Sequence, residues 1–349
     1  LPAWVRGAED TPSRDNRHPD PLRERELIKL DSEHVIWPIN TEYEITIVEG
    51  ERHPLGALFL LNHKKHLDLS APPVAEVVRE ARRQGAILDL DKHNWPWSMM
   101  LVTEAKVDLF ELTNTHLWRT DFVFSDFFPD YVPDYMQVEH RDGKITERGW
   151  IDFGFQTYYS LLNCGFDLMP SAGTASGVHP VPLGFGRVYV KVDDDFSYDA
   201  WIEGLEKGRS FITTGPMLEV RFEAGLPGEK LRGSKGTMKE VEIEGWARSP
   251  DPITTVEILC NGEVVHSDPV FNLALEGEFE CGARMELCAS TDFQSRWNSG
   301  PGDEIKFALG YGGDLGFLGL QYDVGACFCS LHETHELSDD VIELELCLI

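Results

Sequence analysis

The chain has 349 residues, 42% of them hydrophobic and 11% aromatic, which is enough for one large domain and a smaller one. It carries 31 Lys and Arg against 60 Asp and Glu, a formal charge of −29 at pH 7. This balance argues against nucleic acid or an anionic membrane surface as the main partner, because both repel an acidic face. No stretch approaches the roughly 18–20 apolar residues that span a bilayer, so we expect no membrane partner.

The first 33 residues hold fourteen charged side chains and four prolines, which favours a polar N-terminal arm. The chain begins at Leu1 with neither an initiator Met nor a basic-then-apolar leader. We therefore expect a mature form or a fragment.

Strands and helices alternate from about residue 42 onward. Alternating side chains at 43–48 and an apolar run at 55–61 predict two strands. Pro72-Pro73 and Gly85 enclose an apolar stripe with helical spacing, which predicts a helix between them. Further strands are predicted at 86–90, 107–111, 187–192 and 210–213, and further helices at 151–163 and 197–207. This order indicates an α/β layer or barrel with largely parallel strands, in which chemistry collects at the carboxyl ends of the strands.

Helical patterns end near Pro216. Alternation at 241–246 and 255–259, with an Asn-Gly turn inside 260–265, predicts a β-sandwich of the immunoglobulin-like type. We therefore divide the chain into an arm (1–33), an α/β barrel domain (34–218) and a β-sandwich domain (219–349). Six of the seven cysteines lie in the last 90 residues. The sequence leaves two alternatives open for them, three disulfide bridges or free thiols.

Acidic and imidazole side chains gather at the ends of the predicted strands. Asp89, Asp91 and His93 close the strand at 86–90. Carboxylate oxygens and imidazole nitrogens bind Zn²⁺, Mn²⁺ or Fe, and such an ion activates a water molecule for hydrolysis. The candidate metal ligands are Glu44, His53, His93, Glu111 and His116. His63 and His66 lie in a lysine-rich turn that we expect to be solvated, outside the site.

Other residues are candidates for catalysis and for substrate binding. Lys92, Arg119 or Arg187 would stabilise developing negative charge, and His116 is a candidate proton donor. Candidate substrate contacts are Trp95, Trp97, Trp118, Arg119 and His179. No Gly-x-Ser-x-Gly elbow and no phosphate loop occurs, and Gly184-Phe185-Gly186 is interpreted as a turn.

The sequence resembles the PHP-domain superfamily of metal-dependent hydrolases, and within it the CehA/McbA branch. The similarity covers roughly residues 35–265. Its motifs are Glu44-Ile45-Thr46, His53-Pro54-Leu55-Gly56, Gly85-Ala86-Ile87 leading to His93, Asp108-Leu109-Phe110-Glu111-Leu112-Thr113-Asn114, Arg187-Val188-Tyr189-Val190, and Gly208-Arg209-Ser210-Phe211-Ile212-Thr213-Thr214-Gly215-Pro216.

The resemblance implies a distorted (β/α)₇ barrel that carries a cluster of two or three metal ions and hydrolyses ester, amide or phosphoester bonds. It places Glu44, His53, His93 and Glu111 on ligand-type positions. The first and last metal motifs of the superfamily are missing or altered. No His-x-His strand precedes Glu44, which the resemblance would explain by truncation of the barrel domain upstream of Leu1. Ala175 and Gly177 replace the final Asp and His in a segment that is present.

Three functions follow as hypotheses. The first is a metal-dependent hydrolase of a small-molecule substrate with a reduced metal site. The second is a non-catalytic PHP-like protein that binds a small molecule or carbohydrate by stacking on tryptophans. The third is an interaction module in the β-sandwich, with the barrel as a scaffold. The acidic balance and the cysteine-rich tail favour a periplasmic or secreted location, and no oligomeric state is predicted.

Overall fold

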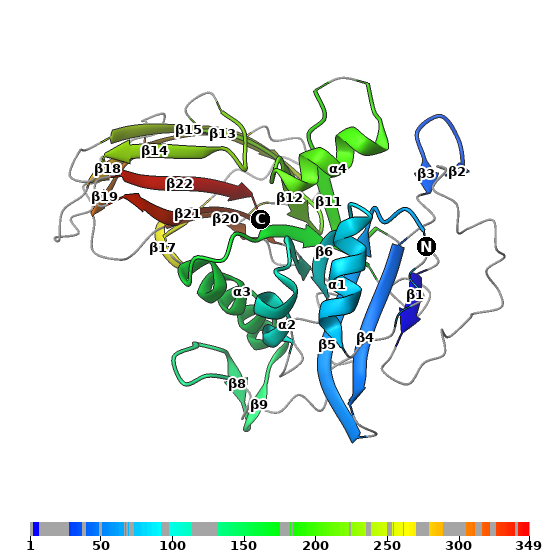
Figure 1. Cartoon of the computed structure of the whole chain (residues 1–349). Coiled ribbons are helices and arrows are strands. Elements are labelled where there is room, and N and C mark those ends of the chain that lie inside the picture. Colours follow the sequence, from blue (N-terminus) through cyan, green and yellow to red (C-terminus); the bar gives the residue numbers. More distant parts are fainter. Residues whose placement is uncertain are drawn as a thin grey trace. The chain divides into compact units, whose positions relative to one another are not determined.

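The computed structural model comprises two compact units, and its strands and helices are labelled in Figure 1. Unit 1 is Leu1–Glu111 with Asp195–Ile202, and unit 2 is Leu112–Asp194 with Glu203–Ile349. The structure describes residues 3–6, 28–36, 40–48, 51–65, 67, 69, 73–91, 98–113, 132–174, 182, 184–193, 195–222, 225–234, 239–249, 253, 255–260, 262–269, 279–288, 305–310, 316–321, 326–338 and 341–348. The predicted arm, barrel and sandwich boundaries stay predictions.

Unit 1 is built on a mixed sheet. Its strands, in spatial order, are β1 (Ala3–Arg6), β4 (Asn40–Val48), β5 (Glu51–Leu61), β6 (Ile87–Asp91) and β7 (Leu109–Thr113). The β1–β4 and β6–β7 pairs are parallel, whereas β4–β5 and β5–β6 are antiparallel. The expectation of largely parallel strands was therefore wrong for β4 and β5. Only two residues separate these strands, and a parallel crossover needs a dozen or more.

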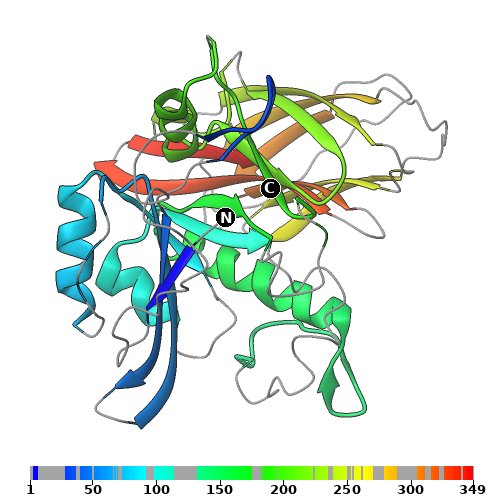
Figure 2. The ribbon, with the colours of Figure 1, turned by 90° about the vertical axis from the view of Figure 1, so that its right-hand side faces the viewer.

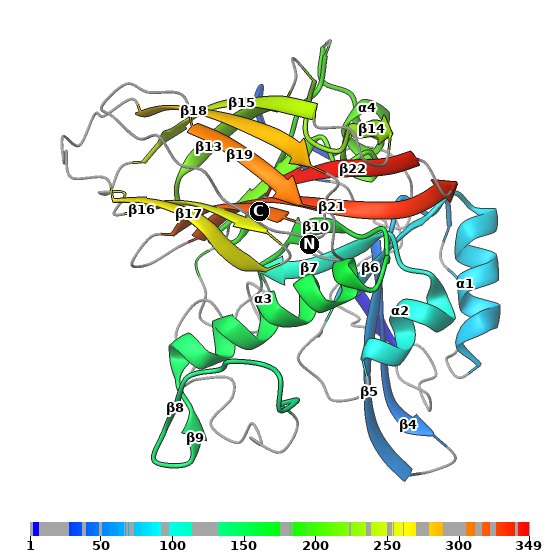
Figure 3. The same cartoon turned by 90° about the vertical axis from the view of Figure 1, so that its left-hand side faces the viewer.

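Two helices accompany this sheet in unit 1. α1 (Val74–Arg83) occupies the predicted helix, buries Val77 and Ala81, and is followed by Gly85 at φ +83°. This left-handed backbone favours glycine, which explains why the helix ends there. α2 (Met99–Ala105), which the sequence did not predict, lies against β5 and β6 (Figure 3).

Unit 2 begins with the end of β7 and contains α3 (Glu147–Asn163), β10 (Met169–Ala172), β11 (Arg187–Val190) and β12 (Ser210–Thr213). β11 and β12 form an antiparallel two-stranded sheet. α3 starts four residues earlier than predicted because Thr146 caps it, accepting a hydrogen bond from the Gly149 amide at 3.0 Å. α4 (Tyr198–Glu206) has residues in both units and occupies the helix predicted at 197–207, and Ser197 Oγ caps it by accepting a hydrogen bond from the Ala200 amide.

Two larger sheets make up the rest of unit 2 (Figure 2). One has the order β13 (Met217–Phe222), β15 (Lys239–Arg248), β18 (Phe279–Cys288) and β19 (Ile305–Gly310). The other has the order β14 (Lys230–Ser234), β22 (Val341–Leu348), β21 (Ala326–Ser338), β20 (Gly316–Gln321), β16 (Thr255–Cys260) and β17 (Glu263–Pro269). β15 and β16 confirm the strands expected at 241–246 and 255–259. Two short strand pairs, β2 (Ile28–Lys29) with β3 (Val35–Ile36) and β8 (His140–Arg141) with β9 (Lys144–Ile145), complete the described strands.

A tight contact joins α3 to the hairpin between β16 and β17 within unit 2. Tyr159 of α3 is buried, and its ring lies so close to Gly262 that a Cβ there would come within 2.9 Å of Cδ2. Burial raises the pKa of the Tyr159 hydroxyl, and the charge of Glu257 on β16 raises it further. The predicted Asn-Gly turn is confirmed at Gly262, whose φ is +83°.

Candidate metal centre

The sheet of unit 1 aligns acidic residues of two strands in one row. Glu44 of β4 pairs with Ala57 of β5, and Ala57 pairs on its other side with Asp91, the last residue of β6. Because register partners lie on the same face of a sheet, Glu44 and Asp91 occupy one face with alanine between them. The next row repeats the pattern, with Glu42 and Asp89 on either side of Phe59.

The end of β6 lies beside the beginning of β7. These strands are parallel, and Asp89 pairs with Leu109 and Leu90 with Phe110. Continuing this register by one residue brings Glu111 beside Asp91. The ends of neighbouring parallel strands are the places where α/β folds build their sites. The sequence predicts that acidic and imidazole side chains meet where these strands end, and this stays a prediction.

Asp89 and Asp91 are shielded from water, with exposed fractions of 6% and 7%. Glu111 is partly buried, and all three residues interact with other residues in the structure, although the buried Oδ1 of Asp89 forms no hydrogen bond there. Burying an ionised carboxylate is costly unless hydrogen bonds or a cation compensate it. This face of the sheet therefore has the acidic character that a cation site needs, on rigid strands.

The remaining predicted ligands are described only in part. Glu44 and His53 lie on β4 and β5, but the structure describes their backbone and not their side chains. The other predicted site residues of this region and of the loops fall outside the described residues: Lys92, His93, Trp95, Trp97, His116, Trp118, Arg119 and His179. Among the described residues, no group of three or more His, Cys, Asp or Glu side chains is placed to hold a metal ion.

Of the predicted catalytic residues, Arg187 lies in the described part of the chain, in unit 2. It is the first residue of β11 and pairs with Thr213 of β12. Its guanidinium carbon Cζ lies 5.9 Å from the centroid of the Tyr189 ring. Gly184, at φ +75°, and the hydrogen bond from the Phe185 amide to the Pro182 carbonyl confirm the predicted turn before this strand.

His63 is buried, so the prediction of a solvated turn was wrong for this residue. Its exposed fraction is 1%, whereas Lys64 and Lys65 beside it are exposed. His63 Nε2 lies 2.9 Å from Thr41 Oγ1, and Nδ1 lies 2.9 Å from the Lys65 carbonyl oxygen. Burial lowers the pKa of the imidazole from 6.5 to about 4, so the ring is neutral at pH 7.

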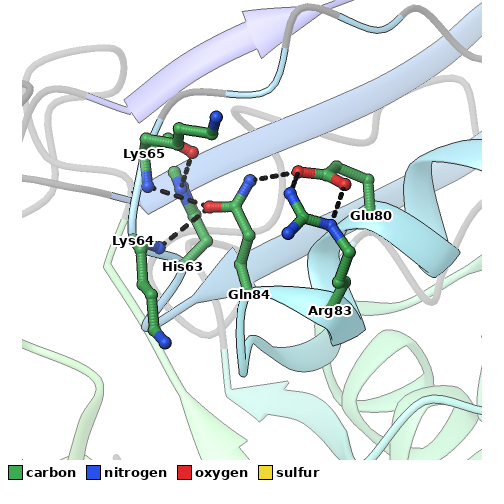
Figure 4. A network of polar contacts seen from close by, with 6 residues as sticks. All are labelled: His63, Lys64, Lys65, Glu80, Arg83 and Gln84. Carbon is green, nitrogen blue, oxygen red and sulfur yellow. Dashed lines mark hydrogen bonds and ion pairs between the residues drawn. The ribbon is translucent and has the colours of Figure 1, made fainter.

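A polar network fixes the segment after β5 to the end of α1 (Figure 4). Gln84, which is 4% exposed, accepts hydrogen bonds from the Lys64 and Lys65 amides at 3.0 and 2.9 Å through Oε1. Its Nε2 donates to Glu80 at 2.7 Å. Arg83 donates to both oxygens of Glu80, and these bonds, with that from Gln84, lower the pKa of the Glu80 carboxyl to about 2. Since all of its polar atoms bond within the protein, Gln84 is a structural residue.

No family model, curated protein or solved structure matches this chain. In the described part of the chain, no helix is long and apolar enough to cross a membrane.

Proposed function

We propose that the chain is a PHP-like metal-dependent hydrolase that cleaves ester, amide or phosphoester bonds of a small-molecule substrate. The observation that carries this proposal is the alignment of Glu44 and Asp91 on either side of Ala57. The register between β6 and β7, continued by one residue, brings Glu111 beside Asp91. Three acidic positions thus share one face of the sheet, and in the chain His93 follows β6 and His116 follows β7.

The donor types fit a Zn²⁺, Mn²⁺ or Fe ion. Carboxylate oxygens and imidazole nitrogens together suit these metals, whereas oxygens alone would suit Mg²⁺ or Ca²⁺. In this proposal Glu44 and Glu111 hold the metal together with His53, His93 and His116. When bound, such an ion makes a water molecule acidic enough to attack at neutral pH.

The roles of the protein's own residues follow from their places in the chain. Ala57 adds only a methyl group between Glu44 and Asp91 in this row of the sheet. Asp91 ends β6 two residues before His93 and adds a buried carboxylate to this face. We assign proton transfer to the leaving group, or a further ligand position, to His116.

Hydrolysis assays test the proposal. The full chain is offered 4-nitrophenyl acetate, 4-nitroacetanilide and 4-nitrophenyl phosphate, before and after chelator treatment and after return of Zn²⁺, Mn²⁺ or Fe²⁺. We expect turnover of at least one substrate that chelation abolishes and metal restores. Glu111→Gln should lower kcat/KM by about 100-fold or more, because loss of even an outer partner of a metal ligand costs about 10–100-fold. The exposed Glu104 on α2 provides the control, Glu104→Gln, which should keep full activity.

Turnover that survives both chelation and Glu111→Gln would refute the hydrolase proposal. Absence of turnover, together with metal-independent quenching of tryptophan fluorescence by a carbohydrate, would favour the non-catalytic alternative, a protein that binds its ligand on Trp95, Trp97 and Trp118.

A further inference from the structure

Arg187 is a partly buried cation that has no carboxylate partner in the described structure. Its Nε is shielded from water and forms no hydrogen bond there. The contrast with the rest of the described chain is clear. Each of five other arginines contacts a carboxylate: Arg82, Arg83, Arg148, Arg209 and Arg221. Acidic residues outnumber basic ones by 60 to 31, so the missing partner of Arg187 does not reflect a shortage of carboxylates.

Exposure separates Arg187 from other unpaired arginines. Arg79 and Arg141 also lack an ion pair among the described residues, but both are exposed, so water solvates their charge. Arg187 is only partly accessible to water, and its Nε atom is buried. A shielded charge without hydrogen bonds or a counter-ion is costly, and an anion that binds there would offset the cost.

The side chain of Arg187 lies beside an aromatic platform. Its Cζ is 5.9 Å from the Tyr189 ring centroid, and Tyr189 stacks on Phe211 with centroids 5.1 Å apart and planes at 12°. Tyr189 and Phe211 are register partners in the β11–β12 sheet, so the stack is part of the sheet itself. A cation–π contact holds a guanidinium through its charge and leaves its N–H groups free to donate.

The backbone just before Arg187 is fixed by Thr174. Thr174 Oγ1 accepts a hydrogen bond from the Gly186 amide at 3.0 Å and donates one to the Gly186 carbonyl oxygen at 2.9 Å. A Cβ at Gly186 would lie 2.6 Å from the Gly173 carbonyl oxygen, so the two segments are in close contact. The strand that carries Arg187 therefore starts from a rigid point, which lowers the entropy lost when a ligand binds.

We infer that Arg187 is an anion-binding residue that holds a carboxylate or phosphate group of a small-molecule ligand. The planar guanidinium matches the two oxygens of such a group in a bidentate arrangement, which an ammonium group lacks. The inference does not depend on the metal centre, because every residue that carries it belongs to unit 2.

Binding of simple anions tests the inference. Inorganic phosphate and acetate are titrated separately into the ¹⁵N-labelled full chain after treatment with a chelator, which keeps bound metal from holding the anion. The readouts are the Arg Nε–H resonances and the dissociation constant. We expect saturable binding of at least one anion, and the one bound more tightly identifies the group. Arg187→Gln should weaken it by about 10-fold or more, because charge-assisted bidentate hydrogen bonds are lost.

Two further variants separate charge and geometry from non-specific effects. Arg187→Lys should bind with intermediate affinity, because it keeps the positive charge but cannot form the bidentate pair of hydrogen bonds. Arg141→Gln removes an exposed arginine of the same unit and should bind as the unaltered chain does. The inference is overturned if neither anion saturates, if Arg187→Gln binds normally, or if Arg141→Gln loses as much affinity. If Arg187→Gln does not fold, unchanged affinity in Arg187→Lys overturns it.

Discussion

Thr41 Oγ1 and His63 Nε2 lie 2.9 Å apart in the interior of unit 1, and their hydrogen bond joins β4 to the segment after β5. The direction of this bond follows from the other ring nitrogen. The Lys65 carbonyl can only accept, so Nδ1 carries the proton, and in the neutral ring Nε2 accepts from the Thr41 hydroxyl. Protonating the ring would put a proton on Nε2 as well and would bury a charge.

The first prediction is that His63 makes the chain less stable as the pH falls from 6.5 to about 4. Burial lowers its folded pKa to about 4, so in this window the unfolded chain binds a proton that the folded chain does not. Stability from this residue is complete above pH 6.5 and decreases as the pH falls through the window. Since one pKa unit equals about 1.4 kcal/mol, the loss in unfolding free energy is about 3 kcal/mol.

Denaturant unfolding at several pH values measures this effect. His63→Gln keeps polar atoms at the site but does not titrate, so the stability difference between the original chain and this variant should shrink as the pH falls from 6.5 to 4. An equal pH dependence in both proteins would contradict a buried, neutral His63.

The second prediction concerns Gln84, which holds the Lys64 and Lys65 amides. Gln84→Met keeps most of the side-chain volume but removes the acceptor of two backbone N–H groups. We expect the unfolding free energy to fall by about 1–3 kcal/mol, the usual cost of unsatisfied buried polar groups. Arg83→Gln is the control within the same network, and it should change stability little because Arg83 is exposed. Equal effects of both substitutions would show that Gln84 does not fix this segment.

The third prediction tests the contact between α3 and the β16–β17 hairpin. In Gly262→Ala, the added Cβ would lie 2.9 Å from Cδ2 of the buried Tyr159, and the residue would keep a φ of +83°. Gly143→Ala is the matched control, because Gly143 has a φ of +74° but no atom within 4 Å of its Cβ position. Both variants should lose about 1 kcal/mol from the left-handed backbone, and Gly262→Ala about 1–3 kcal/mol more from overpacking.

Thermal and denaturant unfolding of these two variants give the difference directly. Equal destabilisation by both substitutions would show that Tyr159 does not pack tightly on the hairpin.

Local signals in the sequence predicted the elements of the fold well. The helix after Pro73 ends before Gly85 as expected, and the alternation at 43–48 forms part of β4. These features depend on residues close together in the chain: a proline, a glycine, or a period of two. Strand direction was predicted less well, because the antiparallel pairing of β4 and β5 depends on how the sheet is assembled.

His63 shows why the burial of a single residue could not be predicted from the sequence. The two lysines that follow His63 are exposed, as the sequence predicted. His63 itself is buried because it bonds to Thr41, which lies 22 residues away on β4. The row formed by Glu44, Ala57 and Asp91 could not be predicted from the sequence either, because the register of a strand is set by how it pairs and not by spacing along the chain. That acidic residues meet where parallel strands end, because such strands end at one edge, stays a prediction for this chain.

Metal content per chain, measured by elemental analysis on protein purified without chelator, tests the metal centre most directly. We predict about one or more equivalents of Zn, Mn or Fe, because the proposed ligands complete at least one site. His93→Ala and Glu111→Ala should lose the metal, whereas Glu104→Ala, at an exposed position on α2, should retain it. A chain without bound metal, or one that keeps its metal in both ligand variants, would contradict the proposed metal centre and the hydrolase activity that depends on it.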